Sequence, residues 1–149
     1  MKISTKVEFG IIAMIDIAIY SENNEAVTVY SIAKRQNISS KYLEQILTVL
    51  RQADLIKGLK GSKGGYIITR PAEEITVREI IDALDMSILG NVDFSSQYDS
   101  ALFNAVDACI WDEMTSYLQK FAENLTLADI ISQYRSSIEE NQEQIMYYI

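Results

Sequence analysis

The sequence of 149 residues contains no histidine and a single cysteine, Cys109. The absence of histidine removes the commonest general base and the commonest metal ligand from any interpretation of the chain as an enzyme. One cysteine cannot form a disulfide within the chain, which fits a reducing compartment. The sequence also lacks a clear group of nucleophile, base and orienting residue. We therefore expect a protein that is not an enzyme and has no metal site.

Proline and glycine are scarce as well, with one and six residues, and this leaves little room for a linker. The hydrophobic content of 48% is enough for one sizeable core. No apolar run approaches the roughly 20 residues of a membrane span, and the start "MKISTKVEFG" lacks the apolar stretch of a signal peptide. We expect a cytoplasmic protein that does not contact a membrane.

Positive charge is in the minority, since 13 Lys and Arg stand against 21 Asp and Glu, but it is unevenly distributed. Residues 1–78 contain 11 basic and 8 acidic side chains, whereas residues 79–149 contain 2 and 13. Within residues 28–70 the counts are 8 and 2. A basic segment in an acidic protein is typical of an anion-binding surface, although a solvated charged face gives the same pattern.

Two helices are expected before the turn at residue 37. Thr5 and Glu8 have the spacing of a capping box, which predicts the start of a first, largely buried helix. Its apolar pattern ends near Ser21. Thr28 then has the position of a cap for a short second helix through "VYSIAKRQ".

A third helix is expected from Ser39 to about Ala53, with an apolar face opposite a polar one. The apolar positions are Leu43, Ile46, Leu47 and Leu50, and the polar positions are Lys41, Glu44, Gln45 and Thr48. Two helices joined by a tight turn, the second with a polar outer face, suggest a helix-turn-helix. This signal is weak by itself, because any small helical bundle contains such pairs.

The segment "LIKGLKGSKGGYIITR" predicts a β-hairpin, because apolar and polar residues alternate on both sides of a glycine-rich tip. A hairpin directly after a helix-turn-helix is the wing of a winged helix, and Lys60 and Lys63 at its tip would lie beside phosphates. A P-loop is excluded because no G-x-x-x-x-G-K-[S/T] motif is present. The expected fold class is mainly α with a small β-hairpin.

Two helices are expected after the hairpin. Thr76 and Glu79 have capping-box spacing before a helix that should support the wing. From about Asp99 a longer helix carries an apolar stripe, which we interpret as a dimer interface, with packing inside one subunit as the alternative. The stripe consists of Leu102, Val106, Cys109, Ile110, Met114, Tyr117, Leu118 and Phe121. We expect a winged helix-turn-helix DNA-binding domain at 1–85, and a dimerisation helix with a C-terminal tail at 86–149.

Five segments occur in a characteristic order: "MKISTK", "ISSKYLEQILTVLRQADLI", "KGSKGGY", "ITVREIIDALD", and a tryptophan followed by "TLADI". Together they resemble the Rrf2 family of bacterial winged-helix transcription regulators, which includes IscR, NsrR and the cysteine-metabolism repressor CymR. The resemblance implies a homodimer that binds a partly palindromic DNA operator, with its third helices in major grooves and its wings at minor grooves. It is closest to the CymR branch, which implies a repressor of cysteine metabolism.

Carried onto this sequence, the DNA contacts of the family fall on the start of the chain, the third helix and the wing. These positions are Lys2, Ser39, Ser40, Lys41, Tyr42, Glu44, Gln45, Lys60, Gly61, Ser62, Lys63 and Gly64. Lys41 can donate to guanine or phosphate, Glu44 can accept from cytosine, and Gln45 can bridge adenine. Tyr42 either contacts the DNA backbone or packs inside the protein. Lys60 replaces the usual arginine and lacks its planar fork, so we expect weaker recognition of minor-groove shape.

The best-known sensors of the family hold an iron-sulfur cluster with three closely spaced cysteines, whereas this chain has one. We therefore expect a regulator without a cofactor. Cys109 is expected to be a small buried hydrophobic residue, with a reactive thiol as the alternative. The signal would then be a small ligand near the dimer helices, oxidation of Cys109, or a protein partner.

The chain ends in "QEQIMYYI", an ending similar to that of the CymR branch, whose members work with the cysteine synthase O-acetylserine thiol-lyase. We expect Tyr147, Tyr148 and Ile149 to dock into that enzyme, where backbone N–H groups would bind the terminal carboxylate. In the alternative, the tail covers the dimer core of its own protein. A less favoured function is a protein-interaction module that binds the enzyme without specific DNA binding.

Overall fold

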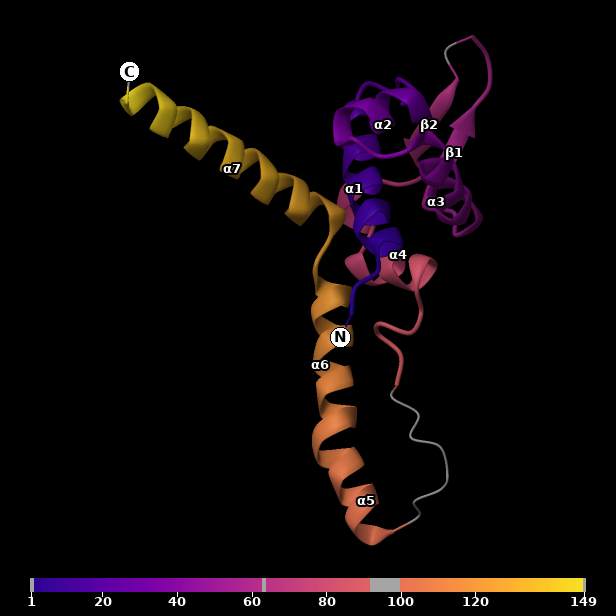
Figure 1. Cartoon of the computed structure of the whole chain (residues 1–149), viewed down its shortest axis with the longest axis vertical. Helices are drawn as coiled ribbons and strands as arrows, with labels where there is room; N and C mark the ends of the chain where they lie inside the picture. The colour runs from indigo at the N-terminus through magenta and orange to yellow at the C-terminus, as the bar shows by residue number, and fades with distance from the viewer. Residues whose placement is uncertain (1, 63, 92–99, 149) are drawn as a thin grey trace.

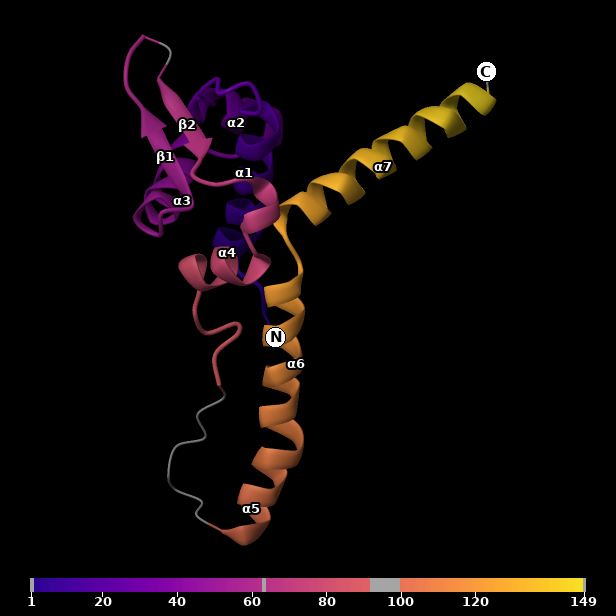
Figure 2. The ribbon, with the colours of Figure 1, turned by 180° about the vertical axis from the view of Figure 1, so that it is seen from behind.

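Figure 1 shows the computed structural model of the chain, which describes residues 2–62, 64–91 and 100–148. A helical body carries the β-hairpin at one end, and α6 extends from the body in the other direction. Helix α7 leaves the body on the side opposite α3 and the hairpin, as both views show (Figures 1 and 2). Among the residues so described, no helix is long and apolar enough to cross a membrane.

The elements follow each other in an order typical of a winged helix. They are α1 (Thr5–Tyr20), α2 (Val29–Gln36), α3 (Ser40–Gln52), β1 (Ile56–Leu59), β2 (Gly65–Ile68), the 3-10 turn η1 (Ala72–Glu74), α4 (Val77–Leu84), α5 (Ala101–Val106), the π-helical turn η2 (Asp107–Trp111), α6 (Asp112–Asn124) and α7 (Leu127–Tyr147). This order confirms the predicted fold class, mainly α with one hairpin.

The start of α1 differs from the prediction. Ser4 is the N-cap, and its hydroxyl accepts a hydrogen bond from the N–H of Val7 at 3.4 Å. The predicted capping box of Thr5 and Glu8 is wrong, because Ser4 has the extended backbone of a cap whereas Thr5 is already helical. The other predicted starts are confirmed, at Thr28, at Ser39 and at the capping box of Thr76 with Glu79.

One hydrophobic core joins the first four helices, the hairpin and the start of α7. Its fully buried side chains include Met14, Ile17, Ile32, Leu43, Leu47, Ile80 and Leu127. Ile131 of α7 also belongs to this core, beside residues of α1. Residues far beyond position 85 therefore complete the core of the winged helix. The division into domains at 1–85 and 86–149 stays a prediction.

A buried carboxylate connects α1 to α2, and the apolar pattern of α1 gave no indication of it. Asp16 is 2% exposed. Its Oδ1 accepts from Nη2 of Arg35 at 2.7 Å, and its Oδ2 accepts from Nε of Arg35 at 3.0 Å and from Nε2 of Gln36 at 2.8 Å. The hydrogen bonds to Asp16 raise the pKa of Arg35, whose guanidinium also lies 3.9 Å from the ring centroid of Tyr20. Because a buried charge needs such partners, the pair fixes α2 against α1.

The hairpin is attached to the body by backbone hydrogen bonds. β1 and β2 pair in antiparallel register, with Ile56 opposite Ile68. Val27 adds a bridge. Its N–H donates to the carbonyl of Tyr66 at 2.9 Å, and its carbonyl accepts from the N–H of Tyr66 at 2.8 Å. Gly65 permits this approach, because a Cβ there would lie 2.5 Å from the carbonyl oxygen of Val27.

The long helical segment from α5 to α6 contains the π turn η2 for a reason visible in its sequence. Leu102, Val106, Ile110 and Met114 are spaced by four residues, and each step exceeds a 3.6-residue turn by about 0.4 residue. Three steps accumulate about one residue, which the wider π turn absorbs. The apolar stripe thus stays on one face. The predicted start near Asp99 lies outside the described residues, and the first described helical residue is Ala101.

Another face of α6, which includes Leu118 of the predicted stripe, packs on the winged helix. Ala122 is buried there and Leu118 is half-buried, both in a small cluster with Val77 and Leu89. The backbone N–H of Val77 also donates to the carbonyl of Leu125 at 2.8 Å. Helix α6 is therefore attached to α4, the helix that follows the wing.

We expect Arg35→Ala to lower the free energy of unfolding by about 3 kcal/mol, because it leaves the buried Asp16 carboxylate without its cationic partner. Lys34→Ala is the matched control, since Lys34 is exposed on the same helix, and it should change the value by less than about 0.5 kcal/mol. Urea unfolding at equal protein concentrations measures both. Equal effects of the two substitutions would show that the buried pair does not hold α2 in place.

We expect Gly65→Ala to destabilise the protein by about 1–3 kcal/mol, because the added methyl group would displace β2 from Val27. Gly58→Ala in β1 is the control, since the nearest atom to its added Cβ would lie at 3.9 Å. Thermal unfolding of the two variants gives the comparison. A Gly65→Ala protein as stable as Gly58→Ala would contradict the close approach.

Candidate nucleic-acid interface

The turn between α2 and α3 fixes the direction of α3. Asn37 ends α2 in the left-handed conformation, with φ 54° and ψ 48°, which asparagine tolerates better than most residues. Ile38 is buried, and its N–H donates to the carbonyl of Ala33 at 3.1 Å. Ser39 then caps α3. A buried anchor and two capped ends hold α3 at a set angle to α2, as in a helix-turn-helix.

The predicted division of α3 into two faces is confirmed. The inner positions Leu43, Ile46, Leu47 and Leu50 are fully buried, and the outer positions Ser40, Lys41, Glu44 and Gln45 are exposed. Thr48 is half-buried, and its hydroxyl donates to the carbonyl of Glu44 at 2.8 Å. The first two turns of α3 therefore present one cation, one anion and one amide outward.

Tyr42 and Ser39 have structural roles at the start of α3. The Tyr42 ring is half-buried and meets Phe9 of α1 edge to face, with ring centroids 6.1 Å apart. This contact favours the packing interpretation of Tyr42 over a contact with the DNA backbone. The Ser39 hydroxyl accepts from the N–H of Tyr42 at 3.5 Å. Its own proton remains available for an acceptor such as phosphate.

The tip of the hairpin extends beyond the body on the side of α3 (Figure 1). Lys60, Gly61 and Ser62 are exposed there. Gly61 has a φ of 123°, which favours glycine, and its carbonyl accepts from the N–H of the half-buried Gly64 at 3.0 Å. Lys63 lies outside the described residues. The tip thus places a cation and exposed backbone on the same side of the molecule as α3.

Not every basic residue counted in the sequence is available to an anion. Arg35 is engaged by Asp16, and Nη2 of Arg70 lies 2.9 Å from Oε1 of Glu79. Partial burial alone would raise the pKa of Glu79, but the backbone N–H of Thr76 and the Arg70 guanidinium lower it below its usual range. The count of eight basic residues in 28–70 therefore overstates the charge of the outer surface by two.

Lys2 does not join this surface within one subunit. It is exposed and lines a cleft with Ser87, Trp111 and Leu118. The start of the chain lies beside α6, away from α3 and the hairpin (Figure 1). Contact of Lys2 with DNA stays a prediction.

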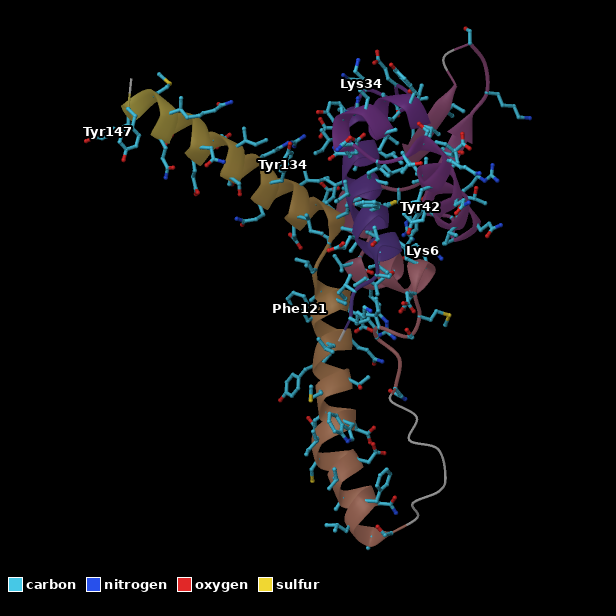
Figure 3. All side chains as sticks on the ribbon, viewed as in Figure 1. Lys6, Lys34, Tyr42, Phe121, Tyr134 and Tyr147 are labelled. Carbon is cyan, nitrogen blue, oxygen red and sulfur yellow. The ribbon has the colours of Figure 1, made fainter. Side chains whose placement is uncertain are left out.

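The apolar stripe of α5 and α6 is uncovered in a single chain. Tyr117 and Phe121 are 70% and 66% exposed, and Phe121 points away from the body in Figure 3. The other exposed members are Leu102, Val106, Ile110 and Met114, whereas Leu118 is half-buried against its own chain. An apolar face of this length is typical of a surface that binds another protein.

Cys109 is exposed in the single chain, so the expectation of a buried residue is wrong for one subunit. It lies in the π turn η2, which packs little against the body. Sequence periodicity assigned it to the stripe correctly, but the stripe itself is an outer surface. Burial of this thiol would require a second protein.

The chain offers few donors for an iron-sulfur cluster. Such clusters need three or four cysteine or histidine ligands, and the sequence has one cysteine and no histidine. Within residues 2–62, 64–91 and 100–148, no group of three or more His, Cys, Asp or Glu side chains is placed to hold a metal ion. The donor set therefore does not fit a cluster.

The C-terminal residues belong to a helix that was not predicted from the sequence. Helix α7 begins with a capping box of Thr126 and Asp129, a signal that could have been recognised in "TLADI". Tyr147 ends the helix, and both Tyr147 and Tyr148 are exposed, whereas Ile149 lies outside the described residues. The end of α7 lies away from α6 of the same chain (Figure 1), so the described part of the tail does not cover its own helix stripe.

The family model of Rrf2, described as an iron-dependent transcriptional regulator, matches residues 3–133. The transcriptional regulator IscR of Cereibacter sphaeroides is 33% identical over 135 residues, which are 88% of this chain and 87% of that protein. Among solved structures, CymR, the global cysteine regulator of B. subtilis, has a TM-score of 0.75 and 30% identity, covering 89% of this chain and 98% of its own.

IscR of T. potens is similar to the same extent, with a TM-score of 0.73 and 33% identity over 92% of this chain and 90% of its own. These relatives are regulators and not enzymes, in agreement with the expectation from the sequence. Their likeness extends over the winged helix and α6 together. The chain belongs to the Rrf2 family of DNA-binding transcription regulators.

Proposed function

We propose that this chain acts as a homodimer that binds a partly palindromic DNA operator and works without an iron-sulfur cluster. The observation that carries the proposal is the exposed polar face of α3 on the same side of the molecule as an exposed, cationic hairpin tip. A helix of this kind fits the major groove of B-DNA, and a wing next to it reaches the neighbouring backbone or minor groove.

Each exposed group on α3 has a partner on DNA. The Gln45 amide can bond adenine at two atoms, the Glu44 carboxylate can accept from the amino group of cytosine, and Lys41 can donate to guanine or phosphate. Ser39 and Ser40 lie at the helix start, where hydroxyl groups commonly bind phosphate. Lys60, Gly61, Ser62 and Gly64 would contact the sugar-phosphate backbone from the hairpin.

The stripe on α5 and α6 is the surface we assign to the dimer. A two-fold axis would bring identical apolar faces together, cover Tyr117 and Phe121, and bury Cys109. Two subunits would then present two α3 helices to two half-sites, which is why a palindrome is expected.

We infer the absence of a cluster from the small number of cysteine and histidine ligands in the chain. Even two subunits together supply two thiolates, one fewer than the family's three-cysteine sites, and no histidine to replace the missing ligand. The signal must therefore act through a ligand, through oxidation of Cys109, or through another protein.

A role as repressor of cysteine metabolism in the cytoplasm is the finer part of the proposal. Its support is the likeness to CymR, a global cysteine regulator, over 98% of that chain. IscR proteins are equally similar, so the likeness alone does not favour cysteine genes over other targets. Docking of Tyr147, Tyr148 and Ile149 into a cysteine synthase has no support in the comparisons and stays a prediction.

We expect Gln45→Ala to weaken binding to the operator by about 1–3 kcal/mol and to relax the preference for one base pair, because a bidentate base contact is lost. Lys41→Ala should also weaken binding. The operator is first selected from random-sequence duplexes, and fluorescence anisotropy then measures affinity at several salt concentrations.

Gln133→Ala provides the control, since Gln133 is exposed on α7 and should leave affinity unchanged. Sedimentation establishes that the variants keep the oligomeric state of the parent protein. Unaltered operator binding by both Lys41→Ala and Gln45→Ala would contradict the assignment of α3 as the recognition helix.

We expect protein purified without oxygen to contain no stoichiometric iron or acid-labile sulfide and to bind its operator as purified. The physical reason is the single thiolate in each subunit. Visible absorbance and metal analysis provide the measurement. Iron-sulfur absorbance that bleaches in air would show that the chain does assemble a cluster.

A further inference from the structure

A cleft lies between α6 and the loop that follows α4. Its apolar walls are Ile88 of the loop, Trp111 at the end of η2, and Met114 and Leu118 of α6. Its volume is about 340 Å³, which is at the small end of the range for sites that bind small molecules. We call it the α6 cleft.

Hydrogen bonds within the chain hold the walls of the α6 cleft in place. Nε2 of Gln119 donates to the carbonyl of Leu89 at 2.7 Å, and this bond attaches the loop to α6. Leu89 is itself buried in the small cluster with Ala122. At the start of the loop, the N–H and the hydroxyl of Ser87 donate to Oδ1 of Asp85 at 3.0 and 2.6 Å. The cleft is therefore formed before any ligand arrives, which lowers the entropic cost of binding.

Thr115 places a hydroxyl without a partner at the α6 cleft. The residue is 8% exposed, and because it lines the cleft, its accessible part opens there. Thr48 and Ser137 show the usual alternative, since each hydroxyl donates to the carbonyl four residues earlier in its helix. The Thr115 hydroxyl makes neither this bond nor any other to the described residues. A nearly buried hydroxyl costs free energy when it is left unpaired, so it indicates a partner supplied from outside the chain.

Lys2 is the one charged side chain among the described residues that line the α6 cleft, where the start of the chain lies beside α6 (Figure 1). The carboxylate of Asp85 in the adjoining loop is engaged by Ser87 and does not line the cleft. A cation beside apolar walls favours a ligand with one negative charge and an apolar body. A phosphate monoester carries nearly two charges, more than one ammonium group neutralises, so a carboxylate fits better.

We propose that the α6 cleft binds a small organic carboxylate and that this ligand changes the affinity of the protein for its operator. The apolar body of the acid would lie between Ile88, Trp111 and Leu118. Its carboxylate would pair with Lys2, and one of its oxygens would accept from the Thr115 hydroxyl. The inference rests on the proposed function, because it supplies the signal that a regulator without a cluster requires.

The position of the α6 cleft explains how its ligand would act on DNA binding. Met114 lines the cleft and is also an exposed member of the stripe assigned to the dimer. The opposite wall follows α4, whose Ile80 belongs to the same core as Leu43 of α3. A ligand between the two walls would shift α6 against the winged helix, and with it the spacing of the two α3 helices in a dimer.

Trp111 is the only tryptophan of the chain, so its fluorescence reports on the α6 cleft directly. The probes are isovalerate, cyclohexanecarboxylate and phenylacetate, each compared with its primary amide. We expect at least one acid to change the fluorescence saturably, with a dissociation constant of about 1 mM or lower. Its amide should bind about tenfold more weakly, because the charge-assisted bond to Lys2 is lost. In anisotropy measurements at constant salt, saturation with that acid should change operator affinity by about fivefold or more, and the amide should not.

Substitutions at Lys2 and Thr115 test the two polar contacts. Lys2→Gln should lower the affinity for the acid to that for the amide, whereas Lys120→Gln removes an exposed charge of α6 outside the cleft and should change neither affinity. Thr115→Val keeps the shape of the side chain and removes the hydroxyl, so it should weaken acid binding by about five- to tenfold. If Thr115 only packs, the valine variant binds the acid unchanged. Thermal unfolding verifies that the three variants are folded.

The outcomes separate this inference from the proposed function. Equal affinity for acids and amides, no saturable response to any of the three acids, or an acid affinity that either Lys2→Gln or Thr115→Val leaves unchanged overturns the acid site, and operator binding by the same protein leaves the proposed function standing. Acid binding without a change in operator affinity overturns the regulatory role. Acid-specific binding by a protein that selects no operator overturns the proposed function instead. Acid binding that depends on both residues and changes operator affinity supports the inference.

Discussion

The orientation of α3 depends on one buried ion pair. Asp16 lies within the apolar stretch of α1, and its two oxygens accept three hydrogen bonds from Arg35 and Gln36 at the end of α2. Because α3 follows α2 after a short turn anchored by Ile38, whatever fixes the end of α2 also fixes α3. Hydrophobic contacts alone allow helices to slide, whereas a buried, directional pair permits one register.

The winged helix also connects α3 and the hairpin to the exposed stripe on α5 and α6, the surface that we assign to the dimer. The N–H of Val77 bonds the carbonyl of Leu125, and the N–H of Leu127 bonds the carbonyl of Ile75, both at 2.8 Å. These bonds join the segment after the wing to the junction of α6 and α7. A change in how two α6 helices pack would therefore move the wing and α3 with them. In a two-site operator, spacing between the α3 helices decides affinity.

Local rules predicted most of the fold, and long-range contacts account for what they missed. The caps at Thr28, Ser39 and Thr76 and the two faces of α3 follow from the spacing of neighbouring residues. The partner of Asp16 lies 19 residues away, so no local pattern identifies it. Likewise, periodicity found the stripe on α6 but could not tell whether its own chain covers it, and Cys109 was misplaced for that reason.

The unequal charge of the two halves of the chain also has a structural meaning. The cations left free after Arg35 and Arg70 are engaged include Lys41 and Lys60, which lie on one side of the molecule with α3 and the hairpin. The acidic residues of α7 project on the opposite side, since the helix leaves the body there. A polyanion is attracted to the first side and repelled by the second, so it meets α3 first. A protein with a net charge of -8 can therefore bind DNA, provided its charges are separated in this way.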